Sequence, residues 1–331
     1  MIIVGAGVIG LSCAWRLSQR GVRVRVFDRR EAGREASWAA AGMLAPSGEY
    51  EQETEAARLA VRSLAAFPSF VAEVAGESGR RIDLRFCGAV EVAFDDAEAS
   101  ALQRRAGARA LWGIESEEAR WEAMAAARFY PGDGMVDPRE LTAALRRACV
   151  LAGVVFHECE KVVRVSKEGE VVTERETYRD DAVLMAAGAW TFALLPDGVA
   201  APRVYPVRGH MLAFNMAPGT LGPILRNAHT YLLQRANGTL VVGATSECAG
   251  FHAGLNEAAL EELRGRAERL LPALTGLNPT ARWNGFRPGI DADAPLIGHL
   301  GGKLWGAFGH YRNGILMAPE TARMVVDMLG A

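Results

Sequence analysis

The sequence predicts an α/β fold, in which a parallel-sheet domain is assembled from separate parts of the chain and an antiparallel sheet is inserted between them. Three observations predict it. Residues 1–28 have the pattern of a strand, a glycine-rich turn, a helix and a second strand, which is a parallel unit. Residues 202–245 contain strands without long helices, and Asn237-Gly238 between two of them is typical of a hairpin. The rest of the chain returns to helices and glycine-rich turns.

The individual elements follow from local patterns of apolar, capping and turn residues. Ile9, Cys13 and Leu17 lie on one stripe of a helix that follows the first strand. Asp137 and Pro138 mark a helix start, because Asp caps the helix and Pro suits its first position. In chain order we expect strands at 1–4, 22–28, 88–94, 162–165, 171–173, 181–187, 205–214, 231–234 and 240–243, and helices at 9–20, 55–74 with an interruption at Pro68, 137–152, 256–271 and the C-terminus.

Composition and charge exclude several classes of protein. The chain has 331 residues, of which 50% are hydrophobic, so it is neither a linker nor a disordered tract. Its 37 basic and 39 acidic residues give a net charge of −2, without the basic block that a nucleic-acid-binding protein needs. The five cysteines are scattered without a C-x-x-C pair, which favours a reducing, cytoplasmic location and no metal site. No apolar run reaches the roughly 18 residues of a membrane span.

A glycine-rich turn predicts a dinucleotide site near the N-terminus. Gly5, Gly7 and Gly10 form a G-x-G-x-x-G pattern between a strand and a helix, and Asp28 ends the next strand. The first glycine permits the tight turn, the second lets a pyrophosphate approach, and the third lets helix and strand pack closely. The helix N-terminus offers free N–H groups to phosphates, and Asp28 can accept a hydrogen bond from a ribose. The sequence therefore predicts a Rossmann-like, dinucleotide-binding domain.

The identity of the dinucleotide depends on further residues. Arg29 and Arg30 are candidates for binding a 2′-phosphate, as in NADP, but Asp28 would repel that group, and two solvated surface arginines are the simpler interpretation. The small residues of 37–43 and the strand end at 186–188 permit close approach to an extended ligand, although either could serve packing alone. With the C-terminal segment Gly309-His310-Tyr311-Arg312-Asn313-Gly314-Ile315, these sites are spread over the whole chain, which favours FAD over a nicotinamide.

Four segments carry a resemblance to a known family: Ala39-Ala40-Ala41-Gly42-Met43-Leu44, Leu240-Val241-Val242-Gly243-Ala244-Thr245, Gly285-Phe286-Arg287-Pro288-Gly289 and residues 309–316. Through them the chain resembles, over nearly its whole length, the FAD-dependent amine oxidases related to D-amino-acid oxidase, and most closely the bacterial glycine oxidases that serve thiazole synthesis for thiamine. The resemblance implies a discontinuous FAD-binding domain, residues 1–84, 136–198 and 285–331, and a substrate-binding domain, residues 85–135 and 199–284.

The resemblance also implies roles for four residues at the substrate. Arg287 would bind the substrate carboxylate, which a guanidinium matches with two hydrogen bonds, although a structural ion pair is the alternative. Tyr231 would be the second carboxylate contact, although a lone strand tyrosine is more often a core residue. Arg312 would lie near the flavin and the substrate entrance, and Met43 would line the pocket beside the ring, unless it only fills a gap.

The resemblance places FAD, bound non-covalently, against a larger set of residues. These are Gly5, Gly7, Val8, Ile9, Gly10, Asp28, Arg29, Ser37, Ala40, Ala41, Gly42, Met43, Val162, Ala187, Gly188, Trp190, Arg287, His310, Tyr311, Arg312, Asn313, Gly314 and Ile315. Nine glycines in the implied flavin and substrate segments should cluster in one cleft: Gly5, Gly7, Gly10, Gly42, Gly188, Gly285, Gly289, Gly309 and Gly314.

The implied reaction is transfer of hydride from the substrate Cα to the flavin, with O2 reduced to hydrogen peroxide and the imine hydrolysed to glyoxylate and ammonia. Neither His229 nor His310 is then required as a general base, and the role of His229 stays open. Gln234 stands where the family often has proline, and Ser246 where one relative has a larger apolar residue. The preference among glycine, sarcosine and small D-amino acids therefore stays open. A D-amino-acid or sarcosine oxidase or dehydrogenase, and a flavin-binding protein without this activity, are the alternatives. The family tends to form homotetramers.

Overall fold

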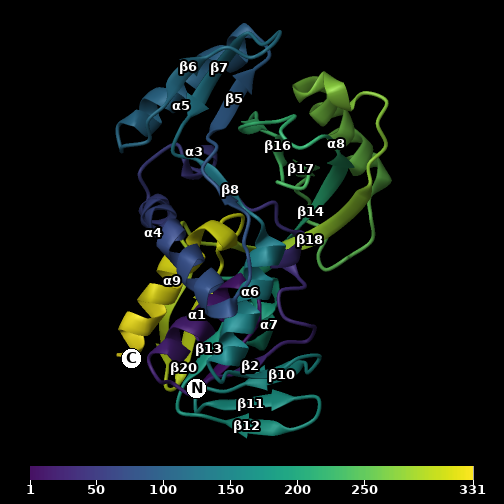
Figure 1. Ribbon diagram of the computed structural model, residues 1–331. Helices are drawn as coiled ribbons and strands as arrows, with labels where there is room; N and C mark the ends of the chain where they lie inside the picture. The colour runs from purple at the N-terminus through teal and green to yellow at the C-terminus, as the bar shows by residue number, and fades with distance from the viewer. Residues whose placement is uncertain (331) are drawn as a thin grey trace.

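The computed structural model describes residues 1–330. The lower half of Figure 1 is built on a six-stranded sheet of order β19-β20-β13-β1-β2-β9. Its neighbouring strands are parallel except for β19 and β20, which are antiparallel. The strands are β1 (Ile2–Val4), β2 (Arg25–Phe27), β9 (Val155–His157), β13 (Val183–Met185), β19 (Leu296–Gly301) and β20 (Leu304–Phe308). The parallel strand–helix–strand unit predicted at the N-terminus is confirmed, with α1 (Val8–Gln19) as the connecting helix.

Four helices pack together beside this sheet, as the lower left of Figure 1 shows. They are α1, α4 (Glu55–Ser78), α6 (Pro138–Leu151) and α9 (Gly314–Leu329). The predicted start of α6 is confirmed, because the Asp137 carboxylate accepts hydrogen bonds from the N–H groups of Arg139 and Glu140 at 2.8 and 3.2 Å. The predicted interruption at Pro68 is wrong. α4 runs through this residue, and the burial of Phe67 and Phe70 on either side of it holds the helix in the core.

Within residues 1–330, α4 is the one helix that is long and apolar enough to cross a membrane by length and composition. Its apolar character is an average hydropathy over 18 residues, and the helix contains no uninterrupted apolar run of that length. Its apolar side packs against α6 and α9, and Val74 on it is fully buried. The helix is therefore accounted for as a core element of this fold.

The upper half of Figure 1 contains an eight-stranded sheet of order β18-β14-β17-β16-β15-β5-β7-β6. Its strands are β5 (Ala89–Ala93), β6 (Glu117–Ala119), β7 (Ala126–Tyr130), β14 (Val204–Asn215), β15 (Ile224–Arg226), β16 (Tyr231–Gln234), β17 (Thr239–Gly243) and β18 (Ala281–Ile290). The predicted hairpin at Asn237-Gly238 is confirmed, with Gly238 at φ +90° between β16 and β17. The sheet is mixed and not fully antiparallel as expected, because β15 pairs with β5 in parallel.

Several elements were not predicted from the sequence. α5 (Asp96–Ala110), β6 and β7 extend the upper left of Figure 1, whereas the predicted helix α8 (Glu257–Leu270) lies at the upper right. The expected domain boundary between residues 284 and 285 falls inside β18, which pairs with β14 along its whole length. The smaller elements are α2 (Ala36–Ala39), β3 (Met43–Leu44), α3 (Pro46–Glu49), β4 (Leu84–Arg85), β8 (Gly134–Val136), β10 (Val162–Val165), β11 (Glu170–Thr173), β12 (Thr177–Arg179), α7 (Thr191–Leu194) and the 3-10 turns Gly188–Trp190 and Pro272–Leu274.

Candidate active site

A cavity of about 1040 Å³ is lined by residues from both large sheets and from the loops between them. It extends from the glycine-rich turn after β1 to strands β16 and β18 of the eight-stranded sheet. Binding sites for large cofactors reach this size. Every residue to which the resemblance assigns a cofactor or substrate role lines this cavity except Gly10. Those predictions came from segments that are far apart in the chain, and the fold brings the segments together.

Gly10 lies outside the cavity because it serves the contact between helix and strand. A Cβ at this position would lie 1.9 Å from the backbone oxygen of Gly5. Gly289 also lies outside, and a Cβ there would lie 2.6 Å from the Tyr205 ring. Seven of the nine glycines expected in one cleft therefore line it, and the other two have packing reasons. Gly5 itself has φ +109°, which only glycine adopts without strain.

The amino end of α1 faces the cavity. Its N-cap residue Gly7 has no side chain to cap the helix, and the Ser37 hydroxyl accepts a hydrogen bond from the Val8 N–H at 2.9 Å. Asp28 accepts from the N–H groups of Ala6 at 2.7 Å and Arg30 at 2.9 Å, although burial raises the pKa of its carboxyl group. The strand-end carboxylate thus fixes the glycine-rich turn and still lines the cavity.

Arg29 is neither a free cation nor a simply solvated residue. Its guanidinium donates to Glu35 at 2.6 Å, and its central carbon lies 3.7 Å from the centroid of the Trp190 ring. The neighbouring Arg30 also pairs with Glu35, at 2.9 Å. Both arginines expected as candidates for a 2′-phosphate are therefore held by one carboxylate. Arg29 and Trp190 together form a wall of the cavity.

The amino end of α9 faces the same cavity from the other side. Its N-cap residue Asn313 makes no capping bond within the helix, and its side-chain amide donates instead to the Tyr50 hydroxyl at 2.9 Å. The ring of the preceding His310 is buried and lies 3.0 Å from the Thr321 hydroxyl. Burial lowers the pKa of His310 to about 3, so the ring is neutral at physiological pH and cannot serve as a cationic group.

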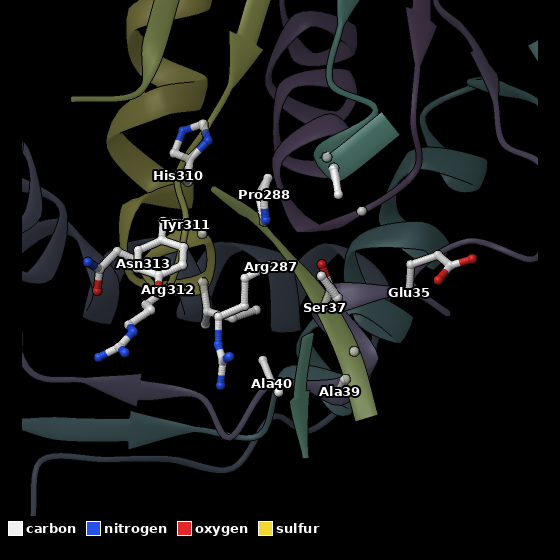
Figure 2. Close-up of a pocket in the computed structure, with 18 of the residues that line it drawn as sticks. Glu35, Ser37, Ala39, Ala40, Arg287, Pro288, His310, Tyr311, Arg312 and Asn313 are labelled. Carbon is white, nitrogen blue, oxygen red and sulfur yellow. The ribbon is translucent and has the colours of Figure 1, made fainter. Parts of the chain in front are cut away.

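The Arg287 side chain is held in place at the far end of the cavity. Its Nη1 donates to the backbone oxygen of Thr245 at 3.1 Å, and a Cβ at Gly209 would lie 2.2 Å from this nitrogen. Figure 2 shows the Arg287 and Arg312 side chains extending to the same side, away from the His310 ring. Among residues 1–330 the other guanidinium donors of Arg287 make no hydrogen bond, so they can bind an anion. The alternative of a structural ion pair for Arg287 is not observed among residues 1–330.

Tyr231 lines the same end of the cavity from β16. Its hydroxyl lies 3.6 Å from the Met211 sulfur, and a Cβ at the cross-strand neighbour Gly243 would lie 2.2 Å from it. Burial raises the pKa of the Tyr231 phenol, against the effect of the nearby Arg287 charge. The hydroxyl therefore keeps its proton and can donate a hydrogen bond.

Two charged residues at this end were not expected. Glu49, at the end of α3, lines the cavity, and burial raises the pKa of its carboxyl group in spite of the nearby charges of Arg312, Arg226 and Arg287. Arg226 is almost fully buried and also lines the cavity. Neither residue stands in a recognisable motif, so only the three-dimensional contacts reveal them.

The two departures from the family pattern have different locations. Gln234 is buried and binds the loop before it, accepting from Leu221 N–H at 3.0 Å and donating to the Ala217 oxygen at 2.8 Å. It does not line the cavity. Ser246 does line the cavity, as does the exposed His229 in the loop before β16.

The cavity fits an extended dinucleotide such as FAD. Two helices turn amino ends without an N-cap side-chain bond toward it, and such ends bind phosphates or other anionic groups. At Gly188 no heavy atom, and at Gly314 only His310 Cβ at 3.8 Å, would contact an added Cβ, so a ligand can approach the backbone closely.

Comparison with known proteins agrees with this geometry. Residues 1–328 match the family model described as FAD dependent oxidoreductase. The chain is 33% identical to a glycine oxidase from Pseudomonas aeruginosa, with 99% of this chain and 94% of that protein aligned. It is also 33% identical to the bifunctional protein ThiO/ThiG from a Synechocystis species, of which it spans 51%. The crystal structure of glycine oxidase from Geobacillus kaustophilus superposes with a TM-score of 0.94 at 30% identity, covering 99% of this chain and 94% of that one. The resemblance that the sequence motifs indicated is confirmed.

Proposed function

The chain belongs to the family of FAD-dependent oxidoreductases, and we propose that, as an FAD-dependent amine oxidase, it oxidises glycine and other small amino acids at the carbon–nitrogen bond. The proposed products are the imine, which hydrolyses to a 2-oxo acid (glyoxylate from glycine) and ammonia, and hydrogen peroxide formed from O2. Small N-methylated or D-amino acids are further candidate substrates.

One observation carries this proposal: Arg287 and Tyr231 line the same cavity as the glycine-rich turn and the amino end of α9. A guanidinium with free donors and a protonated phenol form a site for a carboxylate. The cavity thus combines a carboxylate site with a dinucleotide site. A flavin-binding protein without amine oxidation would have no need of the first.

The protein's own contribution is binding, orientation and electrostatics. Arg287 would bind the carboxylate with two hydrogen bonds, and Tyr231 would donate a third. When bound, FAD supplies the two-electron oxidation of the substrate. The uncapped amino end of α9, with Asn313 and Gly314, would stabilise negative charge near it. Arg312 and Met43 would complete the pocket walls.

The use of the product, the location of the protein and its oligomeric state are further parts of the proposal. Because a ThiO/ThiG protein matches this chain, we infer that the product serves thiazole synthesis for thiamine, as the glycine imine. The scattered cysteines favour a cytoplasmic location, and from the resemblance to the glycine oxidases we propose a homotetramer.

The proposal is tested with the purified flavoprotein. Peroxide formation would be measured with glycine, sarcosine and D-alanine, and flavin reduction would be recorded without oxygen. Peroxide with glycine supports the proposal. Peroxide with D-alanine or sarcosine but not glycine would favour the corresponding oxidase, and flavin reduction without peroxide would indicate a dehydrogenase.

A further inference from the structure

A buried group of charged residues lies beside the substrate end of the cavity. This arginine cluster comprises Arg105, Arg109, Arg226, Glu91 and Asp133, and all but Arg105 are almost fully buried. Arg226 Nη1 lies 3.0 Å from Asp133 Oδ2, and its Nη2 lies 3.4 Å from Glu91 Oε2. Glu91 also binds Arg109 and Arg105, at 2.7 Å each. Each buried carboxylate therefore binds at least one guanidinium.

The cluster binds the segment 46–50, which contains α3. The Ser47 hydroxyl accepts a hydrogen bond from Arg226 Nη2 at 2.6 Å and donates one to the Asp133 carboxylate. A Cβ at Gly48 would lie 2.9 Å from Arg226 Nη1, so the guanidinium lies directly against the backbone. Arg226 and Asp133 thus fix this short segment through the Ser47 side chain.

The other end of the segment is also fixed. Arg109 Nε donates to the Tyr50 backbone oxygen at 3.2 Å, and the Tyr50 hydroxyl accepts from the Asn313 amide at 2.9 Å. Glu49 lies between these anchors and lines the cavity. Since α3 has only four residues, it cannot hold this position by helix propensity alone.

We propose that Arg226 is a positioning residue that, through Ser47 and Asp133, fixes the segment 46–50 and places Glu49 at the carboxylate-binding end of the cavity. The inference rests on the proposed function, because it concerns the substrate site of that reaction. Buried ion pairs give little net stability compared with apolar residues of similar size, and their best-attested use is to fix a geometry. The fork of an arginine can bind Ser47 and Asp133 together, which the single ammonium of a lysine cannot reproduce.

The test compares Ser47→Ala and Arg226→Lys with two controls. Ser63→Ala removes another fully buried hydroxyl, which accepts from the Glu320 N–H at 3.1 Å between α4 and α9, away from the cavity. Arg105→Gln removes a cluster member that binds Glu91 and, like Glu91 itself, neither bonds to the segment 46–50 nor lines the cavity. Four quantities would be measured: KM and kcat for glycine, the melting temperature, the flavin content, and the dissociation constant of glycolate from its effect on the flavin absorption spectrum.

We expect Ser47→Ala to raise both the KM for glycine and the dissociation constant of glycolate about 10-fold, with kcat changed less than 2-fold and flavin retained. This corresponds to roughly 1.4 kcal/mol, the upper range for one hydrogen bond. Arg226→Lys should have at least the same effect. Both controls should lower the melting temperature without changing either constant. Unchanged constants in Ser47→Ala, an equal rise in a control, or loss of flavin would overturn the proposal.

The glycolate titration separates the two levels of inference. If the wild-type flavoprotein oxidises none of the amines tested, the proposed function fails, yet glycolate binding still reports on the carboxylate site. If the wild type is active and binds glycolate, but Ser47→Ala binds it equally well, the positioning role fails alone. Ser47→Ala leaves the Arg226–Asp133 pair at 3.0 Å intact, so this variant should fold.

Discussion

The Arg287 guanidinium lies directly against the Cα of Gly209, so a Cβ at position 209 would be 2.2 Å from Nη1 and 2.4 Å from Nη2. The two residues belong to the paired strands β14 and β18, where Gly209 stands opposite Gly285. The absence of a side chain at 209 therefore sets the position of the guanidinium. Glycine is needed here for space, because its backbone is an ordinary strand and its φ is not positive.

Gly209→Ala should displace Arg287 and weaken substrate binding. We expect the KM for glycine to rise at least 10-fold, since a misplaced guanidinium loses one or more charge-assisted hydrogen bonds, at about 1.5–3 kcal/mol each. The flavin should stay bound. Steady-state kinetics and the absorption spectrum check this. The matched control is Gly107→Ala in the last turn of α5, where a Cβ meets no atom within 4 Å and alanine should stabilise the helix. An unchanged KM in Gly209→Ala would show that Arg287 does not bind the substrate.

Arg287→Lys tests the shape of the carboxylate site. A lysine keeps the charge but offers one ammonium in place of a fork, so we expect a loss of about 100-fold in kcat/KM, or roughly 3 kcal/mol. Arg287→Ala should lose more. Both variants should retain FAD, because most residues that line the cofactor part of the cavity lie elsewhere. Equal kinetics in the lysine variant and the wild type would favour a point-charge role.

Tyr231→Phe removes only a hydroxyl group. Its oxygen contacts the weak acceptor Met211 sulfur at 3.6 Å, so the folded protein depends little on it. We expect the KM for glycine to rise about 5-fold, corresponding to one hydrogen bond of about 1 kcal/mol, with an unchanged melting temperature. A lowered melting temperature with an unchanged KM would instead identify Tyr231 as a core residue.

The parts of the fold that the sequence predicts are those with strong local chemistry. The turn at Gly5, the cap at Asp137 and the hairpin at Gly238 each depend on a few neighbouring residues, and all three are present. α5 was missed because few of its side chains are buried, with Leu102 and Ala106 as its main apolar anchors. A helix with so weak an apolar stripe gives no clear periodicity.

The residues of the candidate site also fall into a group that local patterns predict and a group that they do not. Residues in motifs, such as Arg287 and Arg312, could be assigned by resemblance, because a motif is a local feature. Glu49 and Arg226 could not, since their importance comes from contacts between segments about 180 residues apart in the chain, such as Ser47 with Arg226. Gly209 is likewise significant only through the register of β14 with β18. Which residue stands opposite which is a property of the folded sheet.

The buried His310 makes stability depend on pH in a definite direction. Burial lowers its pKa from 6.5 to about 3, so between these values the unfolded chain binds a proton that the folded protein does not. The contribution of the neutral ring to the free energy of unfolding is fully present above about pH 6.5. It is lost as the pH falls below that value, by up to about 1.4 kcal/mol per pH unit. Urea unfolding at pH 7.5 and pH 5.5, at a fixed concentration of FAD, should therefore show a loss of about 1 kcal/mol that His310→Asn lacks. His299→Asn, at a ring exposed in the folded protein, controls for the substitution itself. An identical pH dependence in wild type and His310→Asn would mean that the ring takes up a proton in the folded protein.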